Sequence, residues 1–426
     1  IRDRACSRLQ RNPSLCNFPW SLERHPRMVG VRMSQGNEGS GLLLPNSAEV
    51  QPIELARMIE EGEPLQIMDV RAPERVAVGR VDRLPSEAFH NIRGSELMHY
   101  KDVPSTGLDP DVPVAVICGH GLDSKILAFH LGRMGLDARS LSGGMFAWMR
   151  LTVPRELDAP EGLDRLIQFD RVGKGCLGYL LVSKGEAIIV DPPLHFPTYL
   201  ELLEESGATL VGVADTHVHA DYVSGAVPLA ERFGVPYFLH AADAVYPYDG
   251  TPGNIDFTPI SEGDAIEFGE TALEVLHTPG HTEGSVTYVM EDRVALTGDF
   301  LFVESIGRPD LGGKEEEWAG ELWTSMVRVI REWNDGMAVY PAHYGQESER
   351  KMGQAVGISF GRLCRENEIL RIQDPEVFLR RILAEKAPFP DAYRKIKAIN
   401  VGLLPVVESE VEELEVGRNE CALGGA

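Results

Sequence analysis

The sequence TLVGVADTHVHADY, residues 209–222, decides how this part of the chain folds and where its chemistry lies. An apolar stretch typical of a buried β-strand leads into His217, His219 and Asp221, which occupy alternate positions. Alternate side chains of an extended segment point to the same face, so we expect these three to lie together beyond the strand. Loops at strand ends commonly carry catalytic and binding residues. The stretch therefore predicts a functional site, and its residue types indicate a metal site.

Three segments further along the chain supply the same residue types, again after apolar stretches. LHTPGHTEGS contributes His281 in a Pro-Gly loop, ALTGDFLF places Asp299 after a predicted strand, and VYPAHYGQ places His343 after another. A pair of histidines alone is often structural. Four strand-to-loop junctions that each deliver an imidazole or a carboxylate are a more specific signal for bound metal.

In their order along the chain, these four motifs resemble those of the metallo-β-lactamase superfamily over about residues 165–355. The resemblance implies an αββα sandwich, in which two packed sheets carry helices on their outer faces. The grouping of predicted strands between residues 163 and 300 independently favours two packed sheets over a doubly wound sheet. Within the match, GRPDL, residues 307–311, resembles the persulfide dioxygenase branch of this superfamily.

Similarity to that branch implies one Fe(II) per chain, held by His217, His281 and Asp299. Two histidines and one carboxylate that leave coordination positions open form the facial triad of non-haem iron oxygenases. Zinc has no accessible redox change and could not activate O2. The resemblance also makes Arg308 a contact for a substrate carboxylate, since a guanidinium pairs well with one. The alternative for Arg308 is an ordinary salt bridge.

Tyr222 stands where dinuclear zinc hydrolases that resemble this chain have a further histidine ligand. A phenol has a pKa of about 10, stays protonated at neutral pH and replaces imidazole poorly. We therefore expect the second metal position to be weakened. We place His219, Asp221, Tyr222 and His343 around the ligands, where they orient them and hold waters.

The sequence VICGHGLDS, residues 116–124, ends a predicted strand and begins a helix, with Cys118 in the turn. Turn amides and a helix N-terminus stabilise a thiolate, whereas the alternative is a small buried apolar cysteine. IMDVRAPER and LSGGMFAW resemble the signatures of rhodanese domains over about residues 48–150, which implies a catalytic, sulfur-carrying Cys118. Sulfurtransferases usually have an arginine where this chain has Asp123, and a carboxylate disfavours a thiolate. A carrier with a different donor, a slow enzyme and a docking domain all remain open.

The predicted organisation is an N-terminal extension without fixed structure, two domains and a C-terminal extension. Alternating strand and helix patterns favour a parallel α/β sheet with helices on both faces in the first, rhodanese-like domain. Residues 151–162 are rich in proline and charge and are expected to be a linker. The helical C-terminal extension is expected to end in a solvated acidic tail. The four parts are residues 1–45, 46–155, 163–360 and 361–426.

Charge and cysteine usage exclude several kinds of partner. The net charge of −24, from 41 basic and 65 acidic side chains, disfavours nucleic acid and anionic lipid surfaces. No apolar run approaches the roughly 18 residues of a membrane helix. Six scattered cysteines without a CxxC pair favour a reducing compartment, and we expect a cytoplasmic protein. The arginine-rich start resembles a mitochondrial transit peptide, but we favour a true start at Met28 or Met33.

Together these observations predict an iron enzyme that oxidises a low-molecular-weight thiol persulfide, such as glutathione persulfide, with O2 to sulfite and thiol. The rhodanese-like domain would pass sulfane sulfur through Cys118 or bind it. One alternative is a metal-dependent thioester hydrolase similar to glyoxalase II. Another is a non-catalytic sulfur-carrier or docking protein. The sequence leaves a homo-oligomer open.

Overall fold

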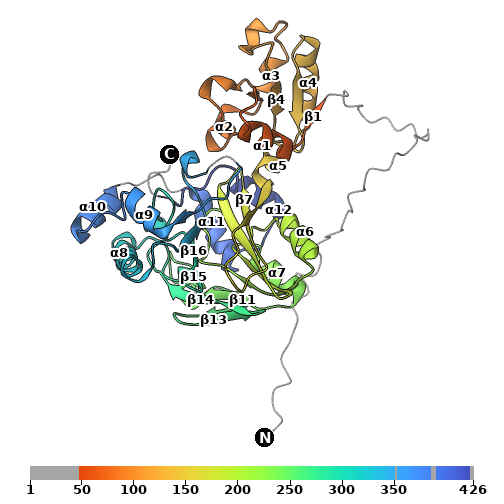
Figure 1. The fold of residues 1–426 in the computed structure, drawn as a ribbon. Coiled ribbons are helices and arrows are strands. Elements are labelled where there is room, and N and C mark those ends of the chain that lie inside the picture. The colour runs from red at the N-terminus through yellow and green to blue at the C-terminus, as the bar shows by residue number, and fades with distance from the viewer. Residues whose placement is uncertain (1–47, 351–352, 385–389, 423–426) are drawn as a thin grey trace. The chain divides into compact units, whose positions relative to one another are not determined.

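The computed structural model describes residues 48–350, 353–384 and 390–422 (Figure 1). The predicted N-terminal extension, residues 1–45, lies outside the described residues. Across the described part of the chain, every helix is too short or too polar to cross a lipid bilayer.

A parallel five-stranded sheet forms the centre of the N-terminal α/β domain. Its elements are β1 (Glu49–Val50), α1 (Pro52–Glu60), β2 (Gln66–Asp69), α2 (Pro73–Val78), β3 (Phe89–Asn91), α3 (Gly94–Leu97), β4 (Val114–Ile117), α4 (Asp123–Arg133), β5 (Ala138–Leu141) and α5 (Gly144–Arg150). The strand order is β1-β5-β4-β2-β3. In β4, Ala115 and Ile117 pack with side chains of α1 and α5, whereas Val114 and Val116 pack with α4. Side chains therefore alternate between two helix-covered faces, which confirms the predicted parallel α/β domain.

Two packed sheets make up the second domain. The first sheet contains β6 (Thr152–Leu157), β7 (Arg165–Arg171), β8 (Cys176–Ser183), β9 (Glu186–Val190), β10 (Thr209–Ala214), β11 (Tyr237–His240) and β12 (Thr258–Ile260). The second contains β13 (Ala265–Phe268), β14 (Thr271–His277), β15 (Val286–Met290), β16 (Val294–Gly298), β17 (Ala338–Pro341) and β18 (Ile358–Ser359). In both sheets the strands lie side by side in chain order.

Helices cover the outer faces of this sandwich (Figure 1). They are α6 (Pro197–Ser206) and α7 (Ala226–Phe233) on the first sheet, and α8 (Glu315–Glu332), α9 (Phe360–Glu366) and α10 (Pro375–Ala384) on the second. In β8, Leu177 and Leu181 face the core between the sheets, whereas Leu180 and Val182 face α6 and α7. This alternation buries each strand on both faces, and the αββα prediction is confirmed.

The predicted linker over residues 151–162 is wrong, because Thr152–Leu157 is the edge strand β6, paired antiparallel with β7. Proline and charged residues suggested a linker. An edge strand tolerates both, since one side of its backbone has no partner strand and a proline there removes no ladder hydrogen bond. The register places Pro154 opposite Phe169.

The predicted solvated tail is also wrong. After α11 (Asp391–Asn400), the chain forms α12 (Glu408–Leu414) and then packs against the second domain. Glu415 is 5% exposed and pairs with buried Arg171 at 2.5 Å, and Cys421 is fully buried. The acidic composition of this segment predicts exposure to solvent. It does not reveal that one acidic residue, Glu415, pairs with a buried arginine.

Candidate metal centre

Four strand ends meet at one buried cluster between the two sheets. His217 follows β10 of the first sheet, whereas His281, Asp299 and His343 follow β14, β16 and β17 of the second. All four side chains are 0–1% exposed. The structure thus brings together the four segments that the sequence analysis singled out.

Three atoms of this cluster converge without hydrogen-bond partners. His217 Nε2 lies 3.5 Å from Asp299 Oδ2, and His281 Nε2 lies 3.4 Å from the same oxygen. Within the described part of the chain, none of these three atoms makes a hydrogen bond. Leaving a buried polar atom unpaired costs about 1–3 kcal/mol, so three of them pointing at one another indicate a place for a cation. Their residue types and mutual approach within 4.8 Å fit a metal ion.

The two imidazoles are held by their other ring nitrogens. His217 Nδ1 lies 2.9 Å from Thr216 Oγ1, whose hydroxyl donates to the carboxylate of Asp191. His281 Nδ1 lies 2.9 Å from the backbone oxygen of Arg308. Because each Nδ1 donates outward, each Nε2 keeps its lone pair for a metal. Burial also lowers the pKa of His281 well below its ordinary value, which keeps the imidazole neutral.

The carboxylate of Asp299 is held in the same manner. Its Oδ1 bonds to His343 Nδ1, which leaves Oδ2 directed at the two histidines. Burial alone would raise the pKa of Asp299, but His343 and His217 hold it well below its usual range. Burial likewise opposes the charge on His343, whereas Asp221 and Asp299 raise the pKa of His343 well above its ordinary value. Asp299 is therefore ionised and offers one free oxygen.

His219 and Tyr222 form a separate group on the side of Asp191. His219 Nε2 lies 2.8 Å from Tyr222 Oη and 3.1 Å from Asp191 Oδ1. Burial raises the pKa of Tyr222 well above its ordinary value, so the phenol stays protonated. His219 is grouped with Asp191 and Asp215, not with His217. The rings of His217 and His219 are nevertheless in contact, with centroids 4.3 Å apart, so these two lie together as expected. Asp221 instead contacts Cys176 and His343.

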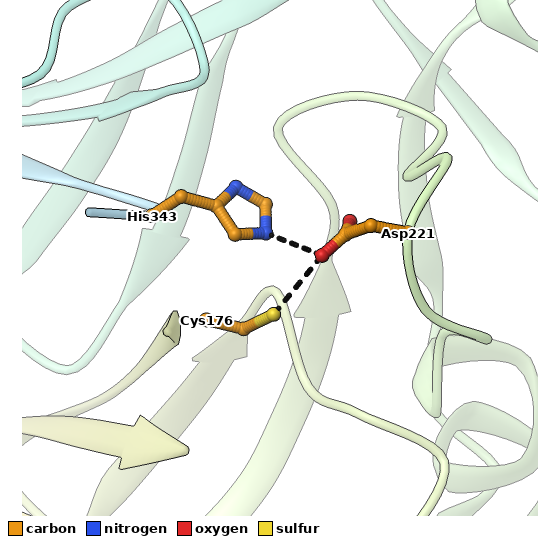
Figure 2. A group of neighbouring side chains, drawn as sticks. All are labelled: Cys176, Asp221 and His343. Atoms are coloured by element: carbon orange, nitrogen blue, oxygen red, sulfur yellow. Dashed lines mark hydrogen bonds and ion pairs between the residues drawn. The ribbon is translucent and has the colours of Figure 1, made fainter. Parts of the chain in front are cut away.

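Asp221 belongs to a third group, shown in Figure 2. Its Oδ2 accepts a hydrogen bond from Cys176 Sγ at 3.2 Å and lies 3.1 Å from His343 Nε2. Burial, together with the Asp221 carboxylate, raises the pKa of the Cys176 thiol to about 12. These three side chains lie within 4.8 Å of one another and could also hold a metal if the thiol lost its proton.

Arg308 is 1% exposed and faces the protein rather than an open surface. Its Nε and Nη2 donate to the two carboxylate oxygens of Asp310, each at 2.7 Å, and its Nη1 donates to the backbone oxygen of Glu420. This geometry favours the salt-bridge alternative over a contact with a substrate carboxylate. The ion pair fixes the backbone oxygen that orients His281.

Cys118 lies in the turn between β4 and α4, where the sequence places it. Its Sγ accepts a hydrogen bond from the Gly121 amide at 3.1 Å and lies 3.2 Å from Ser124 Oγ. The thiol is 4% exposed. Asp123 is the first residue of α4, and its side chain is exposed.

Two buried cysteines near the metal centre were not singled out from the sequence. Cys176 contacts Asp221, and Cys421 lies within 4.8 Å of the ligand atoms of Asp299 and His343. Neither stands in a motif with another ligand type. Their proximity arises from the pairing of distant segments, which no local pattern encodes.

Family models match two parts of the chain. The model of the metallo-beta-lactamase superfamily matches residues 172–350, and the rhodanese-like domain model matches residues 51–151. The boundaries predicted for the domains stay a prediction.

Individual relatives match between 33% and 38% of the chain. An uncharacterized protein of Aquifex aeolicus (strain VF5) is 37% identical over 176 residues, or 38% of this chain and 81% of its own length. The probable metallo-hydrolase YqgX of Bacillus subtilis (strain 168) is 33% identical over 152 residues, or 33% of this chain and 72% of its own length. The mitochondrial persulfide dioxygenase ETHE1 of Homo sapiens is 34% identical over 160 residues, or 37% of this chain and 59% of the human protein.

Proposed function

The chain belongs to the metallo-beta-lactamase superfamily, and from this premise we propose that it is an Fe(II)-dependent persulfide dioxygenase. The proposed substrate is a low-molecular-weight thiol persulfide such as glutathione persulfide, which O2 oxidises to sulfite and the free thiol. The likeness to human persulfide dioxygenase supports this substrate class. The rhodanese-like domain supports a role in sulfur chemistry.

The observation that carries the proposal is the convergence of three unpaired buried atoms, from two histidines and one carboxylate. His217, His281 and Asp299 would hold one Fe(II) ion. Such a triad leaves coordination positions open, and the ion would supply the redox chemistry that lets O2 oxidise the sulfane sulfur. A site with more protein ligands would leave less room for two substrates.

The surrounding residues of the chain position these ligands and exclude water. Thr216 and the backbone oxygen of Arg308 fix the tautomers of the two histidines, and His343 fixes the rotation of Asp299. All three proposed ligands are buried, so the electrostatic interactions among them act in a medium of low polarity. This arrangement presents the ligand atoms before a metal arrives, which favours a defined geometry.

A cavity of about 530 Å³ borders the loops that carry the proposed ligands. Val218 and Thr282, the neighbours of His217 and His281 in the chain, lie in its wall together with Lys397. Lys397 is 1% exposed, and its charge interacts with that of Asp299. We place the approach of the thiol persulfide here, where Lys397 offers a cation for an anionic group although Asp243, Asp249 and Glu283 also line the wall.

For the rhodanese-like domain we propose that Cys118 carries sulfane sulfur. The amide of Gly121 that donates to its Sγ would stabilise negative charge on the sulfur. The exposed Asp123 favours a donor less anionic than thiosulfate. The direction of sulfur transfer depends on whether Cys118 or the metal centre receives sulfane sulfur first. Isotopically labelled sulfane sulfur would show which of the two is labelled first.

Oxygen uptake by protein loaded anaerobically with iron tests the proposed function. The wild type should consume O2 and release sulfite when glutathione persulfide is added. His217→Ala and Asp299→Ala should lose bound iron and oxygen uptake together, whereas His99→Ala, at an exposed position in the first domain, should keep both. Native protein with paired zinc ions, no iron and no oxygen uptake with any low-molecular-weight persulfide would contradict the proposal.

One observation favours a second candidate, a thioester hydrolase similar to glyoxalase II. Cys176, Asp221 and His343 could hold a second metal beside the first, as a dinuclear hydrolase requires. This candidate predicts two zinc ions per chain and hydrolysis of lactoylglutathione in the absence of O2. Unchanged sulfur binding after His217→Ala, without either activity, would instead favour a carrier or docking protein.

A further inference from the structure

The last described residues of the chain lie against the metal centre. The backbone oxygen of Cys421 accepts from the Arg308 amide at 3.0 Å, and the Glu420 amide donates to Tyr393 Oη at 2.7 Å. The Asn419 side chain donates to three backbone oxygens, including that of Lys174 at 3.1 Å. Hydrogen bonds to three consecutive residues, Asn419 to Cys421, hold this segment in one position. A solvated tail would lack such bonds.

Cys421 is the residue that this segment presents to the site. Its side chain is fully buried, and its Sγ lies within 4.8 Å of the ligand atoms of Asp299 and His343. Asp299 Oδ2 is itself buried and has no hydrogen-bond partner. A thiol is therefore held beside the carboxylate of Asp299, one oxygen of which we assign to the metal.

The Sγ atom of Cys421 lies at a position from which one further sulfur atom, bonded to it, could reach the metal. The ligand atoms of His217, His281 and Asp299 form one mutual group, and among the described residues Cys421 is not a member of that group. Its Sγ is close to one proposed ligand without being close to all three. An S–S bond adds about 2 Å, which would bring a second sulfur atom toward the centre of the three ligands.

One charged side chain of the neighbouring cavity interacts with this thiol. Lys397 lies in the cavity wall, and its charge interacts with both Cys421 and Asp299. The charge of Lys397 would draw an anionic persulfide toward the side of the site on which the thiol and Asp299 lie. Proximity of this kind favours transfer between the two sulfur atoms.

We propose that Cys421 is a sulfur-carrying residue, which takes sulfane sulfur from a low-molecular-weight persulfide and presents it to the metal as a protein persulfide. This inference rests on the proposed function and names its immediate substrate. In the first step the Cys421 sulfur bonds to the sulfane sulfur of the donor, the S–S bond of the donor breaks, and the donor leaves as a thiol with the proton of Cys421. In the second step the protein persulfide, one O2 and one water give sulfite, two protons and the Cys421 thiol. Four electrons pass from the sulfane sulfur to O2.

Packing alone gives Cys421 a simpler role. It contacts Ala220, Leu311 and Tyr393, and a small apolar side chain would fill the same space. Under that alternative, Cys421→Ala would retain every property of the wild type. Under the proposal, it would retain the fold and lose the bound sulfur.

Zinc-loaded protein separates the two steps, because zinc has no accessible redox change and should stop the sequence after loading. The zinc form is incubated with glutathione persulfide, freed of small molecules, digested and analysed by mass spectrometry. The Cys421 peptide should gain the mass of one sulfur atom. Cys421→Ser and Cys421→Ala should lose this gain at that position, and the control Cys364→Ser, at a half-buried cysteine in α9, should keep it.

Iron-loaded protein tests the second step. Iron protein loaded with sulfur, freed of donor and exposed to O2 should release one sulfite per chain and lose the added mass from the Cys421 peptide. A zinc form without added mass at Cys421, combined with oxygen uptake by the iron form, would overturn the inference and leave the proposed function intact. An iron form that consumes no O2 with any persulfide would overturn the proposed function, and the zinc form would still decide whether Cys421 carries sulfur.

Discussion

Thr216→Val should weaken metal binding without removing a ligand. The substitution replaces a buried hydroxyl by a methyl group of similar size. That hydroxyl lies 2.9 Å from His217 Nδ1 and 3.0 Å from Asp191 Oδ2, and the residue is 1% exposed. Valine therefore preserves the volume and deletes the hydrogen bond to His217 Nδ1.

The structure sets the size of the expected effect. His217 Nδ1 would lose its partner, and an unpaired buried donor costs about 1–3 kcal/mol. Asp191 would keep the Thr216 amide at 2.7 Å and His219 Nε2 at 3.1 Å. Loss of an orienting partner lowers metal affinity about 10- to 100-fold, which corresponds to about 1.4–2.7 kcal/mol. The two estimates agree, so we expect a metal Kd one to two orders of magnitude higher.

A competition titration against a chromophoric chelator measures this Kd. The matched control is Thr278→Val, which also deletes a fully buried hydroxyl, here one that lies 3.1 Å from Thr287 Oγ1. Thr278 lies in the loop that carries His281, but its hydroxyl bonds to Thr287 and not to a proposed metal ligand. An unchanged Kd for Thr216→Val, or an equal rise for Thr278→Val, would refute the reasoning.

Three other substitutions probe the second metal position, the approach of the loops and the anchor of the C-terminal segment. Tyr222→His should raise bound zinc from one toward two ions per chain, measured by elemental analysis, because imidazole binds zinc at neutral pH and a phenol does not. Gly307→Ala should abolish tight metal binding, because a Cβ there would lie 1.8 Å from the backbone oxygen of Asp299. Glu415→Gln should lower the free energy of unfolding in urea by about 3–5 kcal/mol, because Arg171 would become an unpaired buried charge.

A matched control for each substitution separates these effects from general damage. Gly320→Ala should bind metal as the wild type does, because nothing lies within 4 Å of the added Cβ. Tyr222→Phe should leave the number of bound zinc ions at one. Glu410→Gln removes an exposed ion pair with Lys395 and should cost less than about 1 kcal/mol. If any control behaves like its partner variant, the explanation offered for that variant is wrong.

The sequence was informative wherever a local pattern encodes the structure. A continuous apolar run typical of a buried strand precedes His217 and ends in an abrupt change to polar residues, and both features are visible in one sequence. The same holds for the strands before His281, Asp299 and His343, which is why the layers and the meeting of these segments could be predicted. Side-chain direction beyond the strand end could not, because the bends after β10 follow from tertiary contacts.

The rest of the site depends on pairs of residues that are distant in the chain. Asp191 follows β9 and supports a histidine motif that begins 25 residues later. The segment that carries Cys421 is anchored in part by the pairing of Glu415 with Arg171, which is 244 residues away. An acidic stretch in a single sequence is most simply interpreted as a solvated tail. Its composition does not show that one of its carboxylates has a buried arginine as its partner. Such pairings carry no local signal in a single sequence.

From the sequence, Tyr222 was interpreted as the loss of a second metal ligand and placed among the residues that orient the ligands, and its contacts show how it could do so at the first metal position. Its Oη lies 2.8 Å from His219 Nε2, and both residues contact Asp191. Asp191 has a positive φ of 52°, a conformation that aspartate tolerates better than most residues, and this directs its carboxylate at Thr216. Thr216 in turn orients His217. A histidine at position 222 that turned toward a metal would withdraw one partner from this chain of contacts. In the proposed site, the tyrosine would therefore favour a single, well-oriented metal position over a pair of metal positions.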